Sequence, residues 1–428
     1  MPKYVNIARL RIYWRLYLFV VPAALLVGVF AYFPAASAVY HAFFRWNGSY
    51  VKEFVGLHNF HQLLGWSPFL WLVMIAWVVL LTALLVGRPL WLVQRAPWGL
   101  LALVGVLGVT LFAAGTESTI LHMNAGEAWG WYGRSLLATI VGVGVHQIVR
   151  RNWSQMLQGV LVLYGFLWFF YQSMYATGDQ TLWSGFGVIF ILVLANLIKM
   201  VPSIATAVVI HRLKSERWQY IYRVLFVVPM IVPAMVGLLV WKSFFDPTQG
   251  ILNRVLVGSG LLDVLVWIDE LLGWDVFHLG SSPSWLGDAS LVIPSLIFWG
   301  FPWVGTVGVL IYLTGLAGID DSVYEASEIA GASSLQKFIY IEFPLILTQV
   351  RINLVLMIIG TLQTYGQILI LLGEAGGPQG VALVPGLYMF RSAFVELYAG
   401  KACAIGLIVF FFILLLTEIN NRFVRVDK

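Results

Sequence analysis

The polar residues of this 428-residue chain that could bind a small solute lie within apolar segments. Asn353, Gln363, Tyr365 and Gln367 place amides and a phenol in the apolar run 346–372. Amides exchange hydrogen bonds with hydroxyl groups, and aromatic rings pack on the apolar faces of sugars, so this set suits a hydroxylated solute. The same amides could instead bond neighbouring helices, as is common in membranes. The sequence leaves both interpretations open.

Further residues join this candidate solute path. Gln363 and Gln367 are four residues apart and are expected to share a helix face. Trp299 and Trp303 are also expected one turn apart, with packing as their alternative role. Lys199 lies deep in another apolar run, where a cation is costly and usually has a partner. It could face a cavity or extend its ammonium to the cytoplasmic boundary.

Motifs for catalysis are absent from the sequence. The chain contains no G-x-x-x-x-G-K-[ST], H-E-x-x-H, C-x-x-C or G-x-S-x-G pattern, and these supply phosphate donors, metal ligands or a nucleophile. Glu117, His122 and Glu127 match no spacing of metal ligands and are interpreted as solvated loop residues. The sequence therefore predicts no catalytic residue, no metal or cofactor, and no ATP hydrolysis by the chain itself.

The elements that position these residues are predicted to lie in lipid. Hydrophobic residues make up 60% of the chain and charged residues 11%, and the mean hydropathy is +0.87. Since a soluble domain has about a quarter of its residues charged, this composition indicates a membrane solvent. The net charge of +5 is attributed to loop Lys and Arg rather than to nucleic-acid binding. The single cysteine, Cys403, excludes a disulfide within the chain.

Apolar runs predict an all-α, polytopic integral membrane protein with about ten transmembrane helices. The basic N-terminus followed by an apolar run resembles a signal peptide, but the run is too long, so an uncleaved first helix is expected. The candidate spans are 15–36, 69–87, 98–116, 135–149, 157–176, 183–210, 224–245, 290–316, 346–372 and 402–419.

Loop charges predict the topology. If the N-terminus is cytoplasmic, Lys and Arg fall mostly in inside loops and acidic residues mostly in outside loops, as the positive-inside rule requires. This places both termini in the cytoplasm of a plasma (inner) membrane protein, and it supports an even number of spans better than the number ten. The outside loop 246–289 could lie on the membrane surface as an amphipathic helix. The inside loop 317–345 is the exception, being more acidic than basic.

This inside loop, 317–345, predicts a helix, a turn and a second helix. Aspartates 320–321 can cap the first helix, where backbone N–H groups lack partners. Gly331 permits a sharp change of direction. Serines 333–334 can cap the second helix, and Pro344 marks the start of the next span. Such a compact motif with small residues at its tip can enter a groove on another protein.

The spacing of Glu325, Ala326, Gly331, Ile341 and Pro344 resembles the EAA loop of the membrane subunits of ATP-binding-cassette importers. Four further blocks are similar to the sugar-permease branch, typified by maltose and glycerol-phosphate permeases. They are "FVGLHNFHQLL" (54–64), "RVLFVVPMIVPAMVGLLVWKSFFDPTQGILN" (223–253), "SWLGDASLVIPSLIFWGFPWVGTVGVLIYLTGL" (284–316) and "GEAGGPQG" with "LYMFRSAF" (373–394).

The chain departs from that family pattern at the loop tip and in one long segment. Ala330 stands where the family often has Asp, and Ser327 replaces the second Ala of the motif. Both keep the tip small, as does Ala332. The resemblance covers about 1–65 and 183–428, and it leaves 66–180 as an inserted block of about four helices of unknown function.

The resemblance implies a type I ABC-importer permease core. The N-terminal helix and outer loop occupy 1–65, and the core with the coupling loop 317–345 occupies 181–428. Glu325, Ala326, Ser327, Gly331, Ala332, Ile341 and Pro344 would couple the chain to its ATPase. The implied partners are two cytoplasmic ATPase subunits, a second and non-identical permease, an exterior solute-binding protein and membrane lipid.

Two alternatives belong to other classes. A secondary transporter driven by an ion gradient would need paired carboxylates or an ion site within the spans, and it leaves the cytoplasmic loop unexplained. A membrane-embedded enzyme would need clustered catalytic groups at one depth. The sequence does not define the solute.

Overall fold

The computed structural model describes residues 18–50, 52–65, 133–135, 137–141, 152–273, 275–278 and 280–423. The chain divides into two compact units, Met1–Asn59 with Ser184–Lys428 and Phe60–Trp183. The bounds of the second unit lie close to those of the predicted insertion 66–180, whose role stays a prediction. The predicted spans 69–87 and 98–116, most of 135–149, and Glu117, His122 and Glu127 lie outside the described residues.

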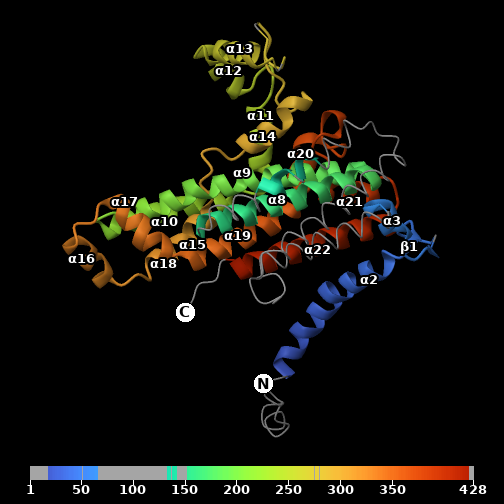
Figure 1. Ribbon diagram of the computed structural model, residues 1–428, viewed down its shortest axis with the longest axis horizontal. Helices are drawn as coiled ribbons and strands as arrows, with labels where there is room; N and C mark the ends of the chain where they lie inside the picture. Colours follow the sequence, from blue (N-terminus) through green and yellow to red (C-terminus); the bar gives the residue numbers. More distant parts are fainter. Residues whose placement is uncertain are drawn as a thin grey trace. The chain divides into compact units, whose positions relative to one another are not determined.

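The described part of the first unit is helical apart from one short hairpin (Figure 1). Strands β1 (Phe44–Trp46) and β2 (Lys52–Phe54) pair antiparallel, with Phe44 opposite Phe54. The helices that form the main packed bundle or border the candidate cavity described below are α9 (Gln180–His211), α14 (Ala289–Phe298), α15 (Thr306–Leu316), α19 (Leu347–Leu362), α20 (Gly366–Leu372) and α22 (Ala399–Phe423). Further helices are η1 (Gly28–Tyr32), α2 (Phe33–His41), α10 (Glu216–Val227), η3 (Val228–Ile231), α11 (Ala234–Phe244), η5 (Pro378–Gly380) and α21 (Pro385–Phe394), and α3 (His58–Leu64) follows the hairpin in the chain.

Within the described residues, three helices are long and apolar enough to cross a membrane, or up to six if each bent pair forms one span. The unbroken ones are Leu18–His41, Gln180–His211 and Ala399–Glu418. Each of the six overlaps one of the six predicted spans outside 66–180, although two of the bent pairs also include helices of the loop 317–345. The helical content and these candidate spans confirm an all-α polytopic membrane protein. In the second unit, α8 (Asn152–Thr177) covers the predicted span 157–176.

Three of the predicted spans are broken rather than continuous. The helical segments 216–231 and 234–244 meet at 86° beside Pro233, which lacks the N–H that would continue the first helix. α14 ends at Phe298 and α15 begins at Thr306, with Pro302 in the break. α19 ends at Leu362 and α20 begins at Gly366. Broken backbone of this kind is tolerated in a membrane only beside protein or water.

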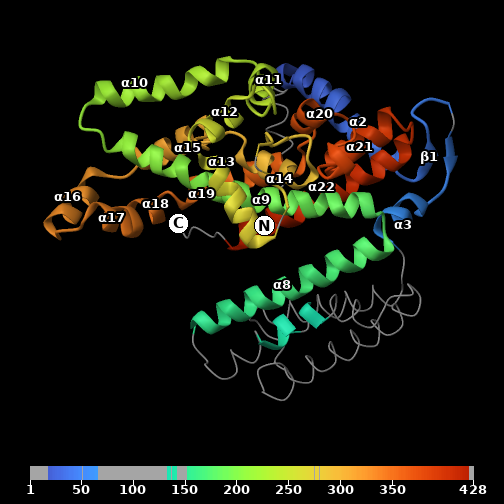
Figure 2. The same cartoon turned by 90° about the horizontal axis from the view of Figure 1, so that it is seen from above.

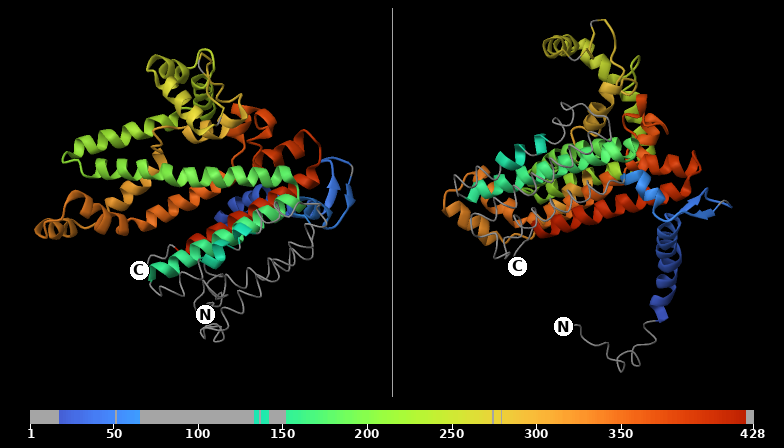
Figure 3. Two further views of the ribbon diagram at one scale, coloured as in Figure 1. Left: turned by 45° about the horizontal axis from the view of Figure 1, so that its top comes forward. Right: turned by 45° about the vertical axis from the view of Figure 1, so that its right-hand side comes forward.

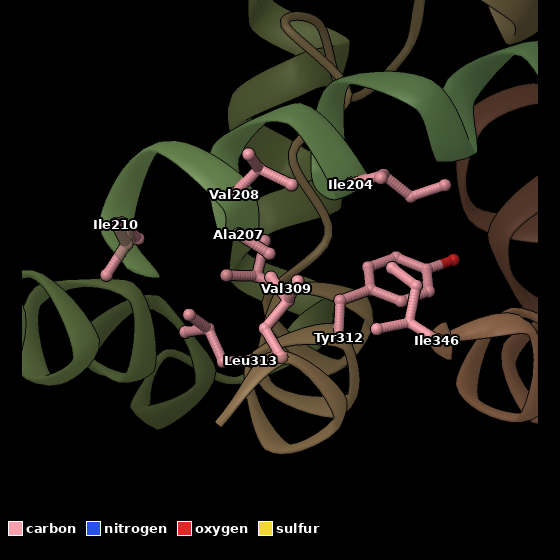
Figure 4. Packing of buried hydrophobic residues seen from close by; sticks show 9 residues of the cluster. Ile204, Ala207, Val208, Ile210, Val309, Tyr312, Leu313 and Ile346 are labelled. Atoms are coloured by element: carbon pink, nitrogen blue, oxygen red, sulfur yellow. The ribbon is translucent and has the colours of Figure 1, made fainter. Parts of the chain in front are cut away.

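The core of the first unit joins α9 to α15 and α19. Ile204, Ala207, Val208 and Ile210 of α9 pack against α15 and against Ile346, which precedes α19 (Figure 4). The residues contributed by α15 are Val309, Tyr312, Leu313 and Leu316. α15 also packs on α19, and α19 on α22, so these helices run side by side (Figures 1 and 2). Burial of these side chains fixes the last two turns of α9 to α15 and to the start of α19.

The predicted amphipathic helix of loop 246–289 is two helices, α12 (Ile251–Gly258) and α13 (Leu261–Leu272), which lie against each other (Figure 3). Gly260 has φ +72° and makes the turn between them. The buried Asp269 carboxylate accepts the N–H groups of Val276 and Phe277 at 2.9 and 3.0 Å, which fixes the chain after α13. The expectation of one helix was wrong because Gly260 breaks the apolar periodicity.

Candidate functional site

The first helix of loop 317–345 is α16 (Asp321–Ile329), and its start is capped as predicted. The Asp320 carboxylate accepts the N–H of Ser322 at 2.9 Å. Hydrogen bonds from the side chain and the backbone N–H of Ser322 stabilise the ionised carboxylate and lower the pKa of Asp320. The carboxylate also faces the positive end of the helix dipole, so it stabilises the first turn of α16.

The turn after α16 is a Schellman motif centred on Gly331, which has φ +69°. The N–H of Ala332 donates to the carbonyl of Ser327 at 3.0 Å, and the N–H of Gly331 to that of Glu328 at 2.9 Å. Both bonds satisfy carbonyls that the helix end would leave free. The left-handed backbone explains why a glycine stands at this position.

The second helix begins with a capping box. The Ser333 hydroxyl accepts the N–H of Gln336, and the Gln336 side chain accepts the N–H of Ser333, at the start of α17 (Ser334–Lys337). The Lys337 ammonium donates to the Glu328 carboxylate at 2.9 Å, and this ion pair lowers the pKa of Glu328. The pair ties α17 back onto α16. The helix then continues through η4 (Phe338–Glu342) and α18 (Phe343–Leu345), which contain Ile341 and Pro344.

A buried ion pair fixes this loop to the spanning helices. The Glu342 side chain is 0% exposed, and its two carboxylate oxygens accept from Nε and Nη2 of Arg212 at 2.9 and 2.7 Å. Arg212 follows the last residue of α9, and its Nη2 also donates to the carbonyl of Ser334 at 3.0 Å. The Tyr324 hydroxyl lies 3.2 Å from Nε2 of His211. Arg212 thus joins the end of α9 to α17 and η4.

The tip of the loop exposes apolar side chains. Ile329 is 90% exposed and Leu335 is 65% exposed, although both lie among charged and small residues. Glu325, Ala326 and Gly331 are exposed, whereas Ser327 is buried and donates its hydroxyl to the carbonyl of Tyr324. The loop therefore presents a rigid helix–turn–helix with an apolar tip. In Figures 1 and 2 it forms one end of the described first unit.

A cavity of about 300 Å³ lies between α9, the end of α14, and the break between α19 and α20. Three predicted solute-path residues line it, namely Lys199, Trp299 and Gln367. The other lining residues are Leu192, Asn196, Leu296, Met357, Gly360, Thr361, Thr364 and Ile368. Asn196 donates to the Thr361 hydroxyl at 3.0 Å, which links α9 to α19 at the wall.

The other predicted path residues do not line this cavity. Asn353 of α19 donates to the Tyr312 hydroxyl of α15 at 2.7 Å. This is a hydrogen bond between neighbouring helices, the second of the two interpretations of the amides. Tyr365 stacks on Phe390 with ring centroids 5.8 Å apart. The expectation that Gln363 and Gln367 share a helix face was wrong, because α19 ends at Leu362, just before Gln363, whereas Gln367 belongs to α20, which begins at Gly366.

The expectation that Trp299 and Trp303 lie one helical turn apart was also wrong. Both lie in the break after α14, and Trp303 has φ +61°. Asn196, Thr361 and Thr364 were missed by the analysis of the sequence. Asn196 stands three residues before Lys199, so the helical period could have placed it beside Lys199.

No family model matches the chain. It is 28% identical to the probable ABC transporter permease protein YurN of Bacillus subtilis (strain 168) over 215 residues, which are 50% of this chain and 66% of that protein. It is 30% identical to the diacetylchitobiose uptake system permease protein NgcF of Streptomyces coelicolor over 191 residues, which are 44% of this chain and 48% of that protein. The chain is a homologue of ABC transporter permeases.

The aligned region covers less than two thirds of each of these two relatives. A solved structure of a bacterial ABC transporter involved in import of the acidic polysaccharide alginate matches with a TM-score of 0.47 at 17% identity, over 65% of this chain and 99% of that chain. Both relatives are named as permease proteins, and neither is named as an enzyme. The chain is thus a multi-pass membrane protein related to transport permeases.

Proposed function

We propose that this chain is a permease subunit of a binding-protein-dependent ABC importer. It would form the translocation path for a sugar, oligosaccharide or related polyol and couple that path to a cytoplasmic ATPase. The single observation that carries the proposal is the capped, exposed helix–turn–helix of 317–345, fixed to the end of a spanning helix. The name of the relative NgcF, a diacetylchitobiose uptake permease, supports a saccharide as the solute class.

The coupling step follows from the rigidity of the loop. Ile329 and Leu335 would enter an apolar groove of an ATPase subunit, as helices dock into grooves elsewhere. Glu325 is exposed and free of the ion pair that holds Glu328, so it can pair with the partner. Closure of two ATPase subunits on ATP would move two such loops. The attached helices would then switch the cavity from outside to inside access.

The proposed assembly separates ATP hydrolysis from the translocation path. Two cytoplasmic ATPase subunits hydrolyse ATP, a second and non-identical permease completes the path, and an exterior binding protein delivers the solute. The chain lies in the plasma (inner) membrane with both termini in the cytoplasm. The segment 66–180 would pass the membrane an even number of times and return the chain to the same side, so the core topology is kept.

Charge reversal at the loop tests this proposal. Glu325→Lys and Gly331→Asp are expected to abolish ATP-dependent uptake and to release the ATPase subunits on purification. Glu216→Lys, an equally exposed charge reversal at the start of α10, and Gly331→Asn, which tolerates the left-handed backbone, should keep attachment. Normal uptake and attachment in both loop variants would refute the coupling role. Uptake that follows an ion gradient without the ATPase subunits would favour a secondary transporter.

A further inference from the structure

The cavity beside α9 carries one formal charge among its eleven lining residues, all of which the structure describes. That charge is the ammonium of Lys199, and the lining includes no aspartate or glutamate. The remaining polar groups are the amides Asn196 and Gln367 and the hydroxyls Thr361 and Thr364. Amides and hydroxyls satisfy neutral hydroxyl groups on a solute, but none of them compensates a cation.

The described contacts of Lys199 do not neutralise it either. Its Nζ donates to the carbonyls of Leu296 and Trp299, both at 3.4 Å, at the long end of the hydrogen-bond range. These carbonyls belong to the end of α14, where the helix has no further N–H groups to offer. They carry only partial charge, so they orient the ammonium and leave its positive charge in the cavity.

A cation held in an apolar span is costly unless an anion joins it. We propose that Lys199 binds an oxyanion on the transported solute, so that the solute is an acidic saccharide. The Trp299 ring would pack on the sugar face, while Asn196 and Gln367 would bond its hydroxyl groups. This inference rests on the proposed importer function and narrows its substrate class from sugars in general to sugars that carry a carboxylate or another oxyanion.

A purely structural role is the competing explanation, in which Lys199 only caps α14. A matched control exists on α11, where Nζ of Lys242 donates to the carbonyl of Ile370 at 3.4 Å. Lys242 makes the same kind of contact between lysine and carbonyl, but it does not line the cavity. Lys199→Met and Lys242→Met therefore separate loss of an anion site from loss of a carbonyl contact. Lys199→Arg keeps the charge.

The experiment uses cells that carry the full chain with its own partner subunits. Wild-type cells, a deletion strain and the three variants receive one pool of hydrolysates from pectin, glucuronoxylan, alginate, starch and cellulose. Depletion of each oligosaccharide from the medium is measured by mass spectrometry, and the amount of the chain in the membrane is measured by immunoblot. The compounds whose uptake is lost in the deletion strain are the solutes of this chain.

These solutes are expected to be acidic. Lys199→Met should slow their uptake on the order of tenfold or more, which corresponds to about 1.4 kcal/mol. Lys199→Arg, which keeps the charge, should slow uptake less than Lys199→Met, and Lys242→Met should keep uptake within about twofold of the wild type, at equal amounts of chain. A neutral solute, or equal effects of Lys199→Met and Lys242→Met, would overturn the inference about an acidic solute. Neither result would contradict the proposed importer function. No difference between the wild type and the deletion strain would refute the proposed importer function, and this inference with it.

Discussion

Replacement of Arg212 by Met is expected to destabilise the chain more than replacement of its partner Glu342 by Gln. The two side chains share two charge-assisted hydrogen bonds, but their exposure differs, at 31% for Arg212 and 0% for Glu342. Removal of Arg212 leaves a carboxylate without its counter-charge and without water. Removal of the Glu342 charge leaves a guanidinium that water can reach. The burial asymmetry therefore sets the order of the two effects.

The magnitudes follow from that asymmetry. Loss of one partner from a buried pair costs about 3–5 kcal/mol. We expect about 3 kcal/mol for Arg212→Met and about 1–2 kcal/mol for Glu342→Gln, the range for loss of a hydrogen bond to a charged group. The double variant Arg212→Met/Glu342→Leu should return to within about 1 kcal/mol of the wild type.

Thermal unfolding in detergent micelles measures these differences. Cys403 is the only cysteine of the chain and is partly buried, so a maleimide that fluoresces on reaction reports when α22 opens. At about 2 °C per kcal/mol for a large chain, Arg212→Met should lower Tm by about 6 °C. The control Glu328→Gln removes an ion pair whose carboxylate is exposed, so it should lower Tm much less than Arg212→Met does.

A larger loss of stability in Glu342→Gln than in Arg212→Met, or a double variant as unstable as Arg212→Met, would contradict the reasoning.

Three further substitutions test local features. Ser333→Ala should cost about 1 kcal/mol of cap energy and speed hydrogen exchange at the start of α17, whereas Ser334→Ala should not. Gly315→Ala places a Cβ 2.6 Å from Cδ of Gln349, so it should lower Tm by several degrees, and shortening Gln349 to Ala should restore it. Asn353→Leu removes an interhelical hydrogen bond and should cost about 1 kcal/mol of stability in Tm assays while leaving the KM for solute unchanged.

The helix–turn–helix of the loop 317–345 could be predicted in detail because its structure is local. Asp320, Ser333 and Gly331 act on groups within a few residues of themselves, and each performs the capping or turning role expected of its residue type. The order of the apolar runs likewise predicted the long helices, because lipid requires about 20 apolar residues for each span. Caps and turns depend on neighbouring residues, and the length of a span depends on the membrane thickness, so both can be predicted from one sequence.

The cavity wall and the ion pair could not be predicted, because they depend on distant contacts. Arg212 and Glu342 are 130 residues apart along the chain, and no local pattern in the sequence pairs these two loop charges. Gln363 and Gln367 have helical spacing, yet the backbone leaves the helix after Leu362 and re-enters one only after Tyr365, which has φ −149° and ψ −43°. A periodicity of 3.6 residues does not register a break when apolar residues continue on both sides of it.

The helix α9 connects the two candidate functional regions. Lys199 lines the cavity from the middle of α9, Arg212 fixes the loop 317–345 at its end, and 13 residues of helix between them span about 20 Å. Between these two positions the Ser203 hydroxyl accepts the N–H of Gly305 at 2.9 Å, so α9 also holds the chain just before α15. The buried ion pair is stronger than this single neutral bond, so the loop and the end of α9 should move together.

A bend in α9 should therefore occur where its own backbone is weakest. That point is Pro202, which lacks an N–H and lies within the helix, three residues from Lys199. Force applied at the loop would be carried by the turns of α9 after Pro202, and bending at Pro202 would change the helix direction beside the ammonium of Lys199. The position of a proline next to the only charged residue of the cavity wall thus gives a physical route from loop movement to a change in solute affinity.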